Sequence, residues 1–248
     1  EIFITRKLAF ASQKSFSRLI IRIAIAAIAL SLAVMVLASG LVRGFQSTIS
    51  GKVYDFFGHV HISKYGDRQS YDEPISIEQD FYPEMQHLDE VRHIQVFAHK
   101  AGIIKKENEL EGVVLKGTGA DFDWKYFQQF IIQGNDLRIS DTADYRGIMI
   151  SNSTATRMKY KVGDKVIIYI FDLDTSNILN SRNRYRDFKI TGIYKTGLEE
   201  FDKRFALVPL KQVQKLNRWE DDEVGGFEVF LENGPPTGNM FSSRGEKK

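Results

Sequence analysis

The sequence predicts an α+β domain carried on a single N-terminal transmembrane helix. A run of apolar residues near the N-terminus is long enough to cross a membrane. From residue 52 to about 232, short strand patterns alternate with short helix patterns, and no repeat is visible. The polar tail over residues 234–248 is rich in Pro and Gly, so it is expected to be disordered or non-native.

The apolar run over residues 23–42 reads IAIAAIALSLAVMVLASGLV and contains no charge. At about 1.5 Å per residue it spans roughly 30 Å, the thickness of the hydrocarbon core of a bilayer. Five basic residues precede it, opposed only by Glu1: Arg6, Lys7, Lys14, Arg18 and Arg22. We therefore predict a transmembrane helix over residues 19–43, with the N-terminus in the cytoplasm and the main domain on the far side.

Two alternatives for this run are a cleaved signal peptide and a buried core helix. The apolar part of a signal peptide usually has about 7–15 residues, which is shorter than this run. The leader over residues 1–18 mixes apolar and basic residues and is expected to form an amphipathic helix at the membrane surface. An ordinary solvated leader is the alternative there.

The region after the apolar run contains turn and cap residues that mark the boundaries of short elements. Asp121 can cap one helix, Ser151 or Asn152 another, and Gly163-Asp164 suits a turn. The predicted elements, in order, are a strand around residues 59–61 with His59 and His61 on one face, a helix over 76–88, two or three strands over 90–117 with a hairpin tip at 107–109, a helix over 121–135, a short helix from 151 or 152, a strand over 165–171, a strand over 188–194, a helix over 209–217 and a last strand over 225–233.

Residues 188–210, FKITGIYKTGLEEFDKRFALVPL, combine a strand, a turn at Thr196-Gly197, a charged crossing over 199–204 and a short apolar strand. The segment has no Cys, His or Gly-rich pattern that would indicate chemistry. We expect it to have an architectural role.

Composition and motifs give no indication of an enzyme. The 34 basic and 32 acidic residues nearly balance, which argues against a nucleic-acid-binding protein. The absence of cysteine excludes disulfides and thiolate chemistry, and no P-loop sequence is present. The five histidines do not have metal-site spacing, so neither a metal nor a cofactor is expected.

Several segments, in this order, resemble the N-terminal part of the FtsX/MacB/LolC-type ABC transporter permeases. They are the basic leader with the apolar run, GFQSTISGKVYDFFGHVHI, GVVLKGTGADFDWKYFQQFIIQG, GIMISNSTATRMKYKVGDKVIIYI, and FKITGIYKTGLEEFDKRFALVPLKQVQKL followed by GGFEVFLEN. The segment around Thr196-Gly197 and Phe201-Asp202 is most similar to the lipoprotein-releasing LolC/LolE group. The resemblance covers about residues 1–233.

The resemblance implies a two-part periplasmic domain on the bacterial inner membrane. A ferredoxin-like porter part is expected from residues 53–116 and 204–233, and an inserted strand-rich part from 117–203. It also implies partners: a cytoplasmic ABC ATPase subunit, a second permease copy or paralogue, membrane lipids, an acylated lipoprotein as substrate and a periplasmic lipoprotein carrier. Family members continue into three more transmembrane helices, so this chain is expected to be truncated.

Two groups of candidate site residues follow. The polar connection over residues 172–187 is long for a hairpin, and the resemblance implies that it binds the carrier through Asp172, Asn180, Arg182, Arg184 and Arg186, of which the arginines are expected to be exposed. A solvated loop is the alternative. The second group lies at the outer end of the apolar run, where helical spacing brings together Leu32, Met35, Val36, Ser39 and Gly40. These residues could contact lipid chains or a partner helix. Ordinary lipid-facing packing is the alternative.

Three other functions stay open at this point. The first is a permease of the same superfamily with another cargo. The second is a mechanotransmitter that activates a cell-wall hydrolase. The third is a membrane-anchored binding module without an ATPase.

Overall fold

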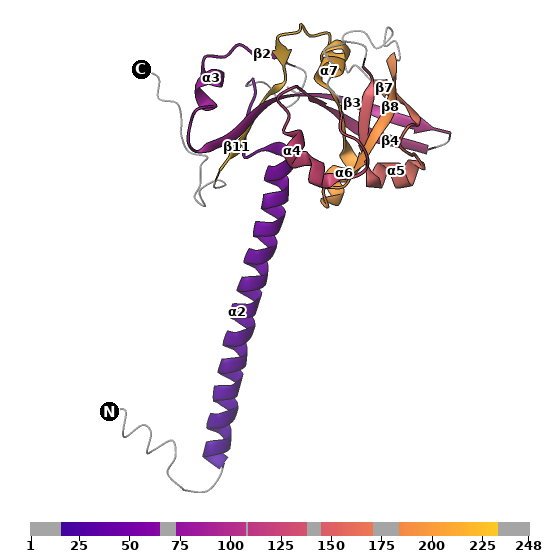
Figure 1. Ribbon diagram of the computed structural model, residues 1–248. Coiled ribbons are helices and arrows are strands. Elements are labelled where there is room, and N and C mark those ends of the chain that lie inside the picture. Colours follow the sequence, from indigo (N-terminus) through magenta and orange to yellow (C-terminus); the bar gives the residue numbers. More distant parts are fainter. Residues whose placement is uncertain (1–15, 65–72, 108, 138–144, 171–183, 233–248) are drawn as a thin grey trace, which may run out of the picture. The chain divides into compact units, whose positions relative to one another are not determined.

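The computed structural model describes residues 16–64, 73–107, 109–137, 145–170 and 184–232 (Figure 1). The chain divides into two compact units, Glu1–Gly51 and Lys52–Lys248. Helix α2 (Phe16–Phe57) runs through the first unit and ends inside the second.

Helix α2 has 42 residues and is therefore about 63 Å long, about twice the thickness of a hydrocarbon core. The stretch from Arg18 to Tyr54 is long and apolar enough to cross a membrane. Its apolar side chains are exposed along the predicted span, which excludes the alternative of a core helix buried within this chain. Residues 44–57 extend the helix by roughly 21 Å beyond the predicted span.

The second unit is an α+β domain, as predicted. Its strands are β1 (Val60–Ile62), β2 (Ile75–Ser76), β3 (Val91–Lys106), β4 (Glu109–Thr118), β5 (Ile131–Gly134), β6 (Gly147–Ser151), β7 (Lys165–Ile170), β8 (Arg184–Tyr194), β9 (Phe205–Pro209), β10 (Glu223–Val224) and β11 (Gly226–Leu231). Its helices are α3 (Phe81–Met85), α4 (Trp124–Phe127) with a 3-10 turn at Gln128–Phe130, α5 (Asn152–Met158), α6 (Glu199–Arg204) and α7 (Leu210–Asn217).

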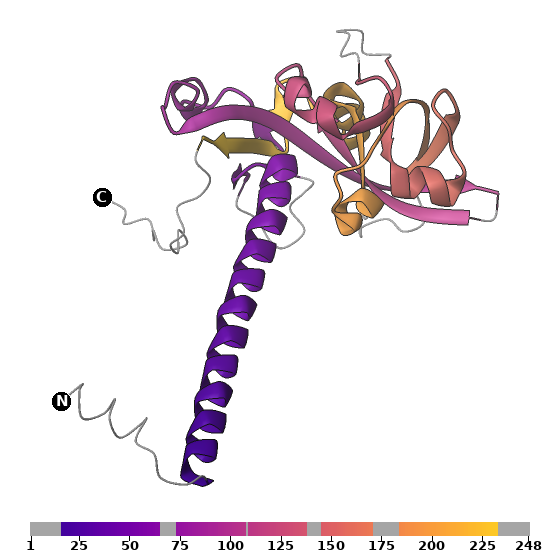
Figure 2. The same ribbon diagram turned by 60° about the horizontal axis from the view of Figure 1, so that its bottom comes forward.

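Strand β3 runs across the whole domain and takes part in two sheet regions (Figure 2). Its first half pairs with β11, which in turn pairs with the short edge strand β1. Its second half pairs with β4 on one side and with β7 on the other. The domain is therefore built around one strand that belongs to both regions.

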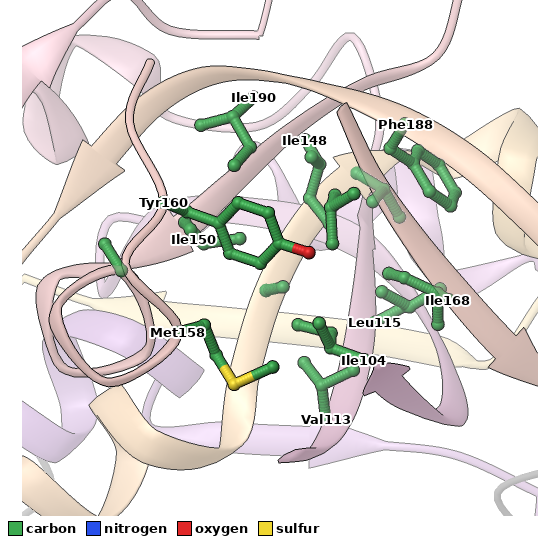
Figure 3. Packing of buried hydrophobic residues seen from close by; sticks show 14 of the residues in the cluster. Ile104, Val113, Leu115, Ile148, Ile150, Met158, Tyr160, Ile168, Phe188 and Ile190 are labelled. Carbon is green, nitrogen blue, oxygen red and sulfur yellow. The ribbon is translucent and has the colours of Figure 1, made fainter. Parts of the chain in front are cut away.

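The second half of β3 is part of a closed barrel. The pairings run from β3 to β4, β9, β6, β8 and β7 and then return to β3, with β4/β9 and β6/β8 parallel and the other pairs antiparallel. One apolar cluster with side chains from all six strands fills it, including Ile104, Leu115, Ile148 and Ile168, each with no exposed surface (Figure 3). Residues of α5 and α7 complete this cluster.

A separate apolar cluster covers the β11–β3 region. Buried residues of these strands, among them Ile94, Phe227 and Val229, pack against Phe81 and Tyr82 of α3 and against β2 and β10. This cluster buries one face of the sheet.

Several predicted elements are confirmed because their signals are local. The β3–β4 hairpin, strand β7 and helix α7 after Pro209 lie where the sequence predicts them. Ser151 is the cap of α5, since its hydroxyl accepts a hydrogen bond from the Thr154 amide at 3.1 Å.

Other element predictions are wrong in part. The helix predicted over residues 76–88 is reduced to the five residues of α3, and Ile75–Ser76 form a strand instead. Asp123, rather than Asp121, caps the next helix, which gives way to β5 at Ile131. The Asp121 carboxylate is used elsewhere, because it accepts a hydrogen bond from the Val96 amide at 2.6 Å.

The predicted division into a porter part and an inserted part stays a prediction. Strand β4 pairs with β3 and β9, and β9 also pairs with β6. The barrel therefore combines strands from both predicted parts. The charged crossing over residues 199–204 is helix α6.

Closure of the barrel between β3 and β7 predicts that Gly102 does not tolerate a side chain. A Cβ atom there would lie 2.7 Å from the Ile168 Cγ2 atom and 3.1 Å from the Tyr169 carbonyl oxygen. We expect Gly102→Ala to lower the free energy of unfolding by about 1–3 kcal/mol, as over-packing does. The measurement is chemical denaturation of the detergent-solubilised chain.

Gly112→Ala is the matched control. Gly112 is on β4, opposite Ile103 of β3, and a Cβ atom at Gly112 would have nothing within 4 Å. That variant should stay within about 0.5 kcal/mol of wild type. Equal stability of the two variants would contradict the close contact between β3 and β7.

Candidate functional site

The predicted lipid-contact residues lie together on one face of α2. Each of positions 32, 35, 36, 39 and 40 has another of the five three or four residues away, and residues at this spacing are neighbours on a helix. Leu32, Met35, Val36, Ser39 and Gly40 are all exposed, with Met35 71% exposed, and a Cβ at Gly40 would have nothing within 4 Å. This face is free to contact lipid chains or another helix.

Helix α2 ends inside the domain with a glycine cap. Gly58 has a φ of +78°, and its amide donates to the Tyr54 carbonyl at 2.8 Å. A Cβ at Gly58 would lie 3.0 Å from the Val229 carbonyl oxygen, so both the backbone angle and the space favour glycine. The cap brings the last turn of the helix directly against strand β11.

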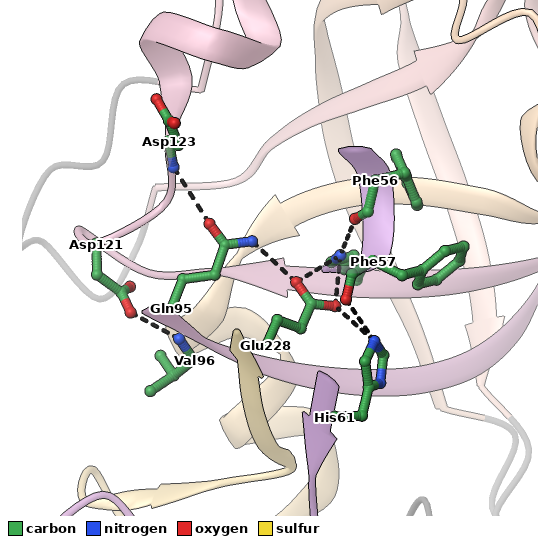
Figure 4. Close-up of polar contacts among 9 residues, drawn as sticks. Phe56, Phe57, His61, Gln95, Val96, Asp121, Asp123 and Glu228 are labelled. Carbon is green, nitrogen blue, oxygen red and sulfur yellow. Dashed lines mark hydrogen bonds and ion pairs between the residues drawn. The ribbon is translucent and has the colours of Figure 1, made fainter. Parts of the chain in front are cut away.

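Lys116 and Glu228 form a buried ion pair at this last turn. Figure 4 shows Glu228 close to Phe56, Phe57 and His61. The Lys116 ammonium donates to Glu228 Oε1 at 2.7 Å, to Oε2 at 2.9 Å and to the Phe56 carbonyl at 2.8 Å. The two side chains are 1% and 0% exposed. Burial lowers the pKa of Lys116, and the Glu228 carboxylate opposes that shift.

Further hydrogen bonds extend this pair into the neighbouring elements. Gln95 donates to Glu228 Oε2 at 2.8 Å and accepts from the Asp123 amide at 3.2 Å, at the start of α4. His61 donates from Nε2 to the Phe57 carbonyl, and its ring lies 3.9 Å from Glu228 Oε1. The polar network therefore joins the end of α2 to β1, β3, β4, β11 and α4.

Aromatic side chains surround the same helix end. The Phe56 ring packs against Phe127, Tyr194 and Phe205, with ring centroids 5.8–6.3 Å apart. The Phe57 ring makes edge contacts with Phe201 at 4.9 Å and Phe205 at 5.1 Å. The Lys116 ammonium lies 4.7 Å from the centroid of the Phe56 ring, so a cation–π contact adds to its hydrogen bond with that residue's carbonyl.

The segment over residues 188–210 positions part of this aromatic cluster. The Tyr194 hydroxyl donates to the Phe205 carbonyl at 2.8 Å. The buried Asp202 carboxylate accepts from the Thr196 hydroxyl at 2.8 Å and from the Thr196 and Gly197 amides, which fixes the turn before α6. These hydrogen bonds are the contacts through which the segment could have the predicted architectural role.

The predicted carrier-binding residues are only partly described. Asp172, Asn180 and Arg182 lie outside the described residues, and Arg184 is the first residue of β8. Arg186 is half-buried rather than exposed as predicted, because it lies directly opposite the buried Ile168 and shares its face.

The outward face of β7 and β8 is partly apolar. Tyr169 and Tyr185 lie opposite each other with ring centroids 6.3 Å apart, and Tyr185 is 67% exposed. Ile167 on the same strand as Tyr169 is also exposed. This face leads into the connection that was predicted to bind a carrier.

The histidines that the sequence places near β1 bond to the backbone. His59 Nδ1 accepts from the Leu231 amide at 3.1 Å, and His61 donates to the Phe57 carbonyl. Among the residues that the structure describes, no group of three or more His, Cys, Asp or Glu side chains could hold a metal ion.

Residues 23–235 match the family model of the MacB-like periplasmic core domain. The chain belongs to this family. The predicted resemblance to FtsX/MacB/LolC-type permeases is thus confirmed at the level of the superfamily.

A curated relative is the lipoprotein-releasing system transmembrane protein LolC of Buchnera aphidicola subsp. Schizaphis graminum (strain Sg), 21% identical over 219 residues. The match covers 88% of this chain and 52% of the relative, so the chain spans about half of that protein's length.

Two solved structures match part of this chain. The periplasmic region of MacB from Actinobacillus actinomycetemcomitans has 15% identity and a TM-score of 0.46, and the match covers 71% of this chain and 75% of that one. The extracellular domain of the noncanonic ABC-type transporter YknZ from Gram-positive bacteria has 15% identity and a TM-score of 0.43, with 69% and 82% covered.

Lys116 and Glu228 are not among the predicted site residues, although the sequence contains a signal for each. Each is a charged residue within a mostly apolar stretch of its strand, in GVVLKGT and in GFEVFL. A charge at such a position is buried only if it is paired. Because the two residues are 112 apart in the chain, nothing local identifies the partner.

His99 gives a prediction for the pH dependence of stability. Burial lowers the pKa of its imidazole from 6.5 to about 3, with repulsion from Lys116 and His61 in the same direction. The unfolded chain therefore binds a proton below pH 6.5 that the folded chain does not bind until about pH 3. The free energy of unfolding should fall as pH falls through this window, by up to about 1.4 kcal/mol per pH unit.

The measurement is denaturant unfolding between pH 6.5 and about pH 4.5, above the range in which most carboxylates titrate. His99→Gln should show a smaller slope than wild type in this interval. Identical slopes would contradict a neutral, buried His99.

Proposed function

We propose that this chain is part of the membrane permease subunit of an ABC transporter that extracts lipoproteins from the outer leaflet of the bacterial inner membrane. The observation that carries the proposal is the family match over residues 23–235, together with a relative named as a lipoprotein-releasing protein over 88% of the chain. In this proposal a separate cytoplasmic subunit hydrolyses ATP. A second permease copy or paralogue completes the membrane part.

The proposed topology follows from the charge distribution around α2. The basic leader lies in the cytoplasm, the apolar part of the helix spans the inner membrane, and the α+β domain lies in the periplasm. The domain is then on the side where a lipoprotein in the outer leaflet is accessible. A periplasmic carrier would receive the lipoprotein on the same side.

The exposed face of α2 fits contact with acyl chains. Exposing an acyl chain to water costs about 0.8 kcal/mol per CH₂ group, so extraction needs an apolar surface that continues from the membrane. Leu32, Met35 and Val36 are exposed and share one helix face, and Ser39 and Gly40 allow another helix to approach. We propose that this face contacts the lipoprotein during its release.

A permease of the same superfamily with another cargo is a second candidate, supported by the family model, whose description refers to MacB. A mechanotransmitter for a cell-wall hydrolase and an anchored binding module are also compatible with one span and one domain. The cargo and partners that co-purify with the full-length protein discriminate among them.

Photo-crosslinking tests the acyl-chain contact. A photoreactive residue at Met35 in the full-length complex, in native membranes, should crosslink to acylated lipoprotein. The matched control is Leu37, which is 73% exposed against 71% for Met35 but points to the opposite face, about 200° around the helix. Labelling of bulk phospholipid alone from both positions would overturn the contact.

Deletion of residues 175–184 tests binding of the carrier. We expect the deletion to abolish co-purification of the periplasmic lipoprotein carrier while the domain stays folded, since the pairing of β7 with β8 over residues 165–169 and 185–189 is kept and only the end pair of Ile170 with Arg184 is lost. In a second variant, a Gly/Ser linker of equal length replaces the same residues. This variant removes the side chains but keeps the length of the connection, so the two effects of the deletion can be distinguished. Unchanged co-purification in both variants would show that this connection is only a solvated loop.

A further inference from the structure

The last turn of α2 has carbonyl groups that the helix itself cannot satisfy. The Tyr54 carbonyl accepts from Gly58, the Phe57 carbonyl from His61, and the Phe56 carbonyl from Lys116. The helix has no basic residue of its own in this turn, so Lys116 supplies a cation at the negative end of the helix dipole from a strand 60 residues further on.

The hydrogen bonds of Lys116 leave it no freedom to follow a movement of this turn. An ammonium group has three protons, and all three are used by the Phe56 carbonyl and the two oxygens of Glu228. If the turn moved away from β4, one N–H of a buried ammonium would lose its acceptor, which is unfavourable. The last turn of α2 and the two strands therefore move together.

The two strands held in this way lead into both sheet regions. Lys116 lies opposite His99 on β3 and opposite Leu207 on β9, so β4 carries the contact into the barrel. Glu228 lies opposite Gln95 on β3 and opposite His61 on β1, so β11 carries it into the other region. One ion pair is thus connected to both parts of the domain.

Stability alone does not account for a charge pair at this place. A buried ion pair is weak evidence for stability, since apolar replacements of similar volume are often neutral or stabilising. The specific property of this pair is the third hydrogen bond, to the backbone of the helix end.

From these contacts we propose that Lys116, held by Glu228, is a positioning residue that fixes the last turn of α2 to both sheet regions. Any displacement of that turn during transport then moves the domain as one body. The consequence for transport rests on the proposed function. The contact itself does not depend on the cargo.

The test uses the double variant K116M/E228Q in the full-length transporter complex. The change removes both charges, keeps side chains of similar size and leaves Gln95 an acceptor at position 228. The matched control is R157M/E111Q, which removes a partly buried ion pair between β4 and α5, with 2.6 Å between Arg157 Nη1 and Glu111 Oε2.

Two quantities are measured: hydrogen exchange of the amides of residues 53–58, and lipoprotein released per ATP hydrolysed. We expect K116M/E228Q to increase exchange in this segment by about tenfold or more, the effect of losing a hydrogen bond to a charged group. Exchange in β4 and β11 should stay near wild type, and release per ATP should fall severalfold while ATP hydrolysis continues. The control should change neither quantity.

Wild-type exchange at residues 53–58 in a folded double variant would overturn the inference, whatever the cargo is. Faster exchange with unchanged release per ATP would overturn the role in transport. Failure of the wild-type complex to release lipoprotein would overturn the proposed function alone, because the exchange measurement needs no cargo.

A second measurement covers the case in which the double variant does not fold. These 248 residues contain no cysteine, so spin labels can be placed specifically at Lys52→Cys and Gly112→Cys once any cysteine elsewhere in the complex has been replaced. The distance between the labels should be the same in the nucleotide-free and nucleotide-bound complex. A different distance in the two states would overturn the inference.

Discussion

The carboxylate of Glu228 lies in the middle of β11 with no exposed surface. Polar groups from several neighbouring elements balance its negative charge. An isolated charge at this position would be strongly unfavourable. Lys116 on β4, Gln95 on β3 and His61 on β1 all direct polar groups toward it. Because Lys116 also bonds to the Phe56 carbonyl, compensation of this one charge fixes where the helix ends relative to the strands.

The aromatic residues around the helix end exclude water from this network. Phe56 and Phe57 pack against side chains that come from α4, β8, α6 and β9, all of them far from the helix end in the sequence. The segment over residues 188–210 supplies several of them, and the Asp202 hydrogen bonds fix its turn. Its architectural role is therefore to bring Tyr194, Phe201 and Phe205 to the helix end.

Features that depend on neighbouring residues were predictable from the sequence, and features that depend on distant ones were not. The apolar run, the β3–β4 hairpin and the Ser151 cap follow from periodicity and cap chemistry within a few residues. Barrel closure depends on pairing β3 with β7 and β4 with β9, which no local pattern reveals. Asp121 was misread as a cap because its true partner, the Val96 amide, lies 25 residues away.

Exposure along the apolar part of α2 and burial at its last turn suit two different tasks. The side chains of Leu32, Met35 and Val36 are free, so in the proposed transporter they can exchange lipid, lipoprotein and helix neighbours. A surface that must exchange neighbours cannot also hold the domain, since a fixed contact would block that exchange. The contact that fixes the domain to the helix is therefore at the last turn of α2. There Lys116 of the buried ion pair makes a directional hydrogen bond to the Phe56 carbonyl, which apolar packing alone does not provide.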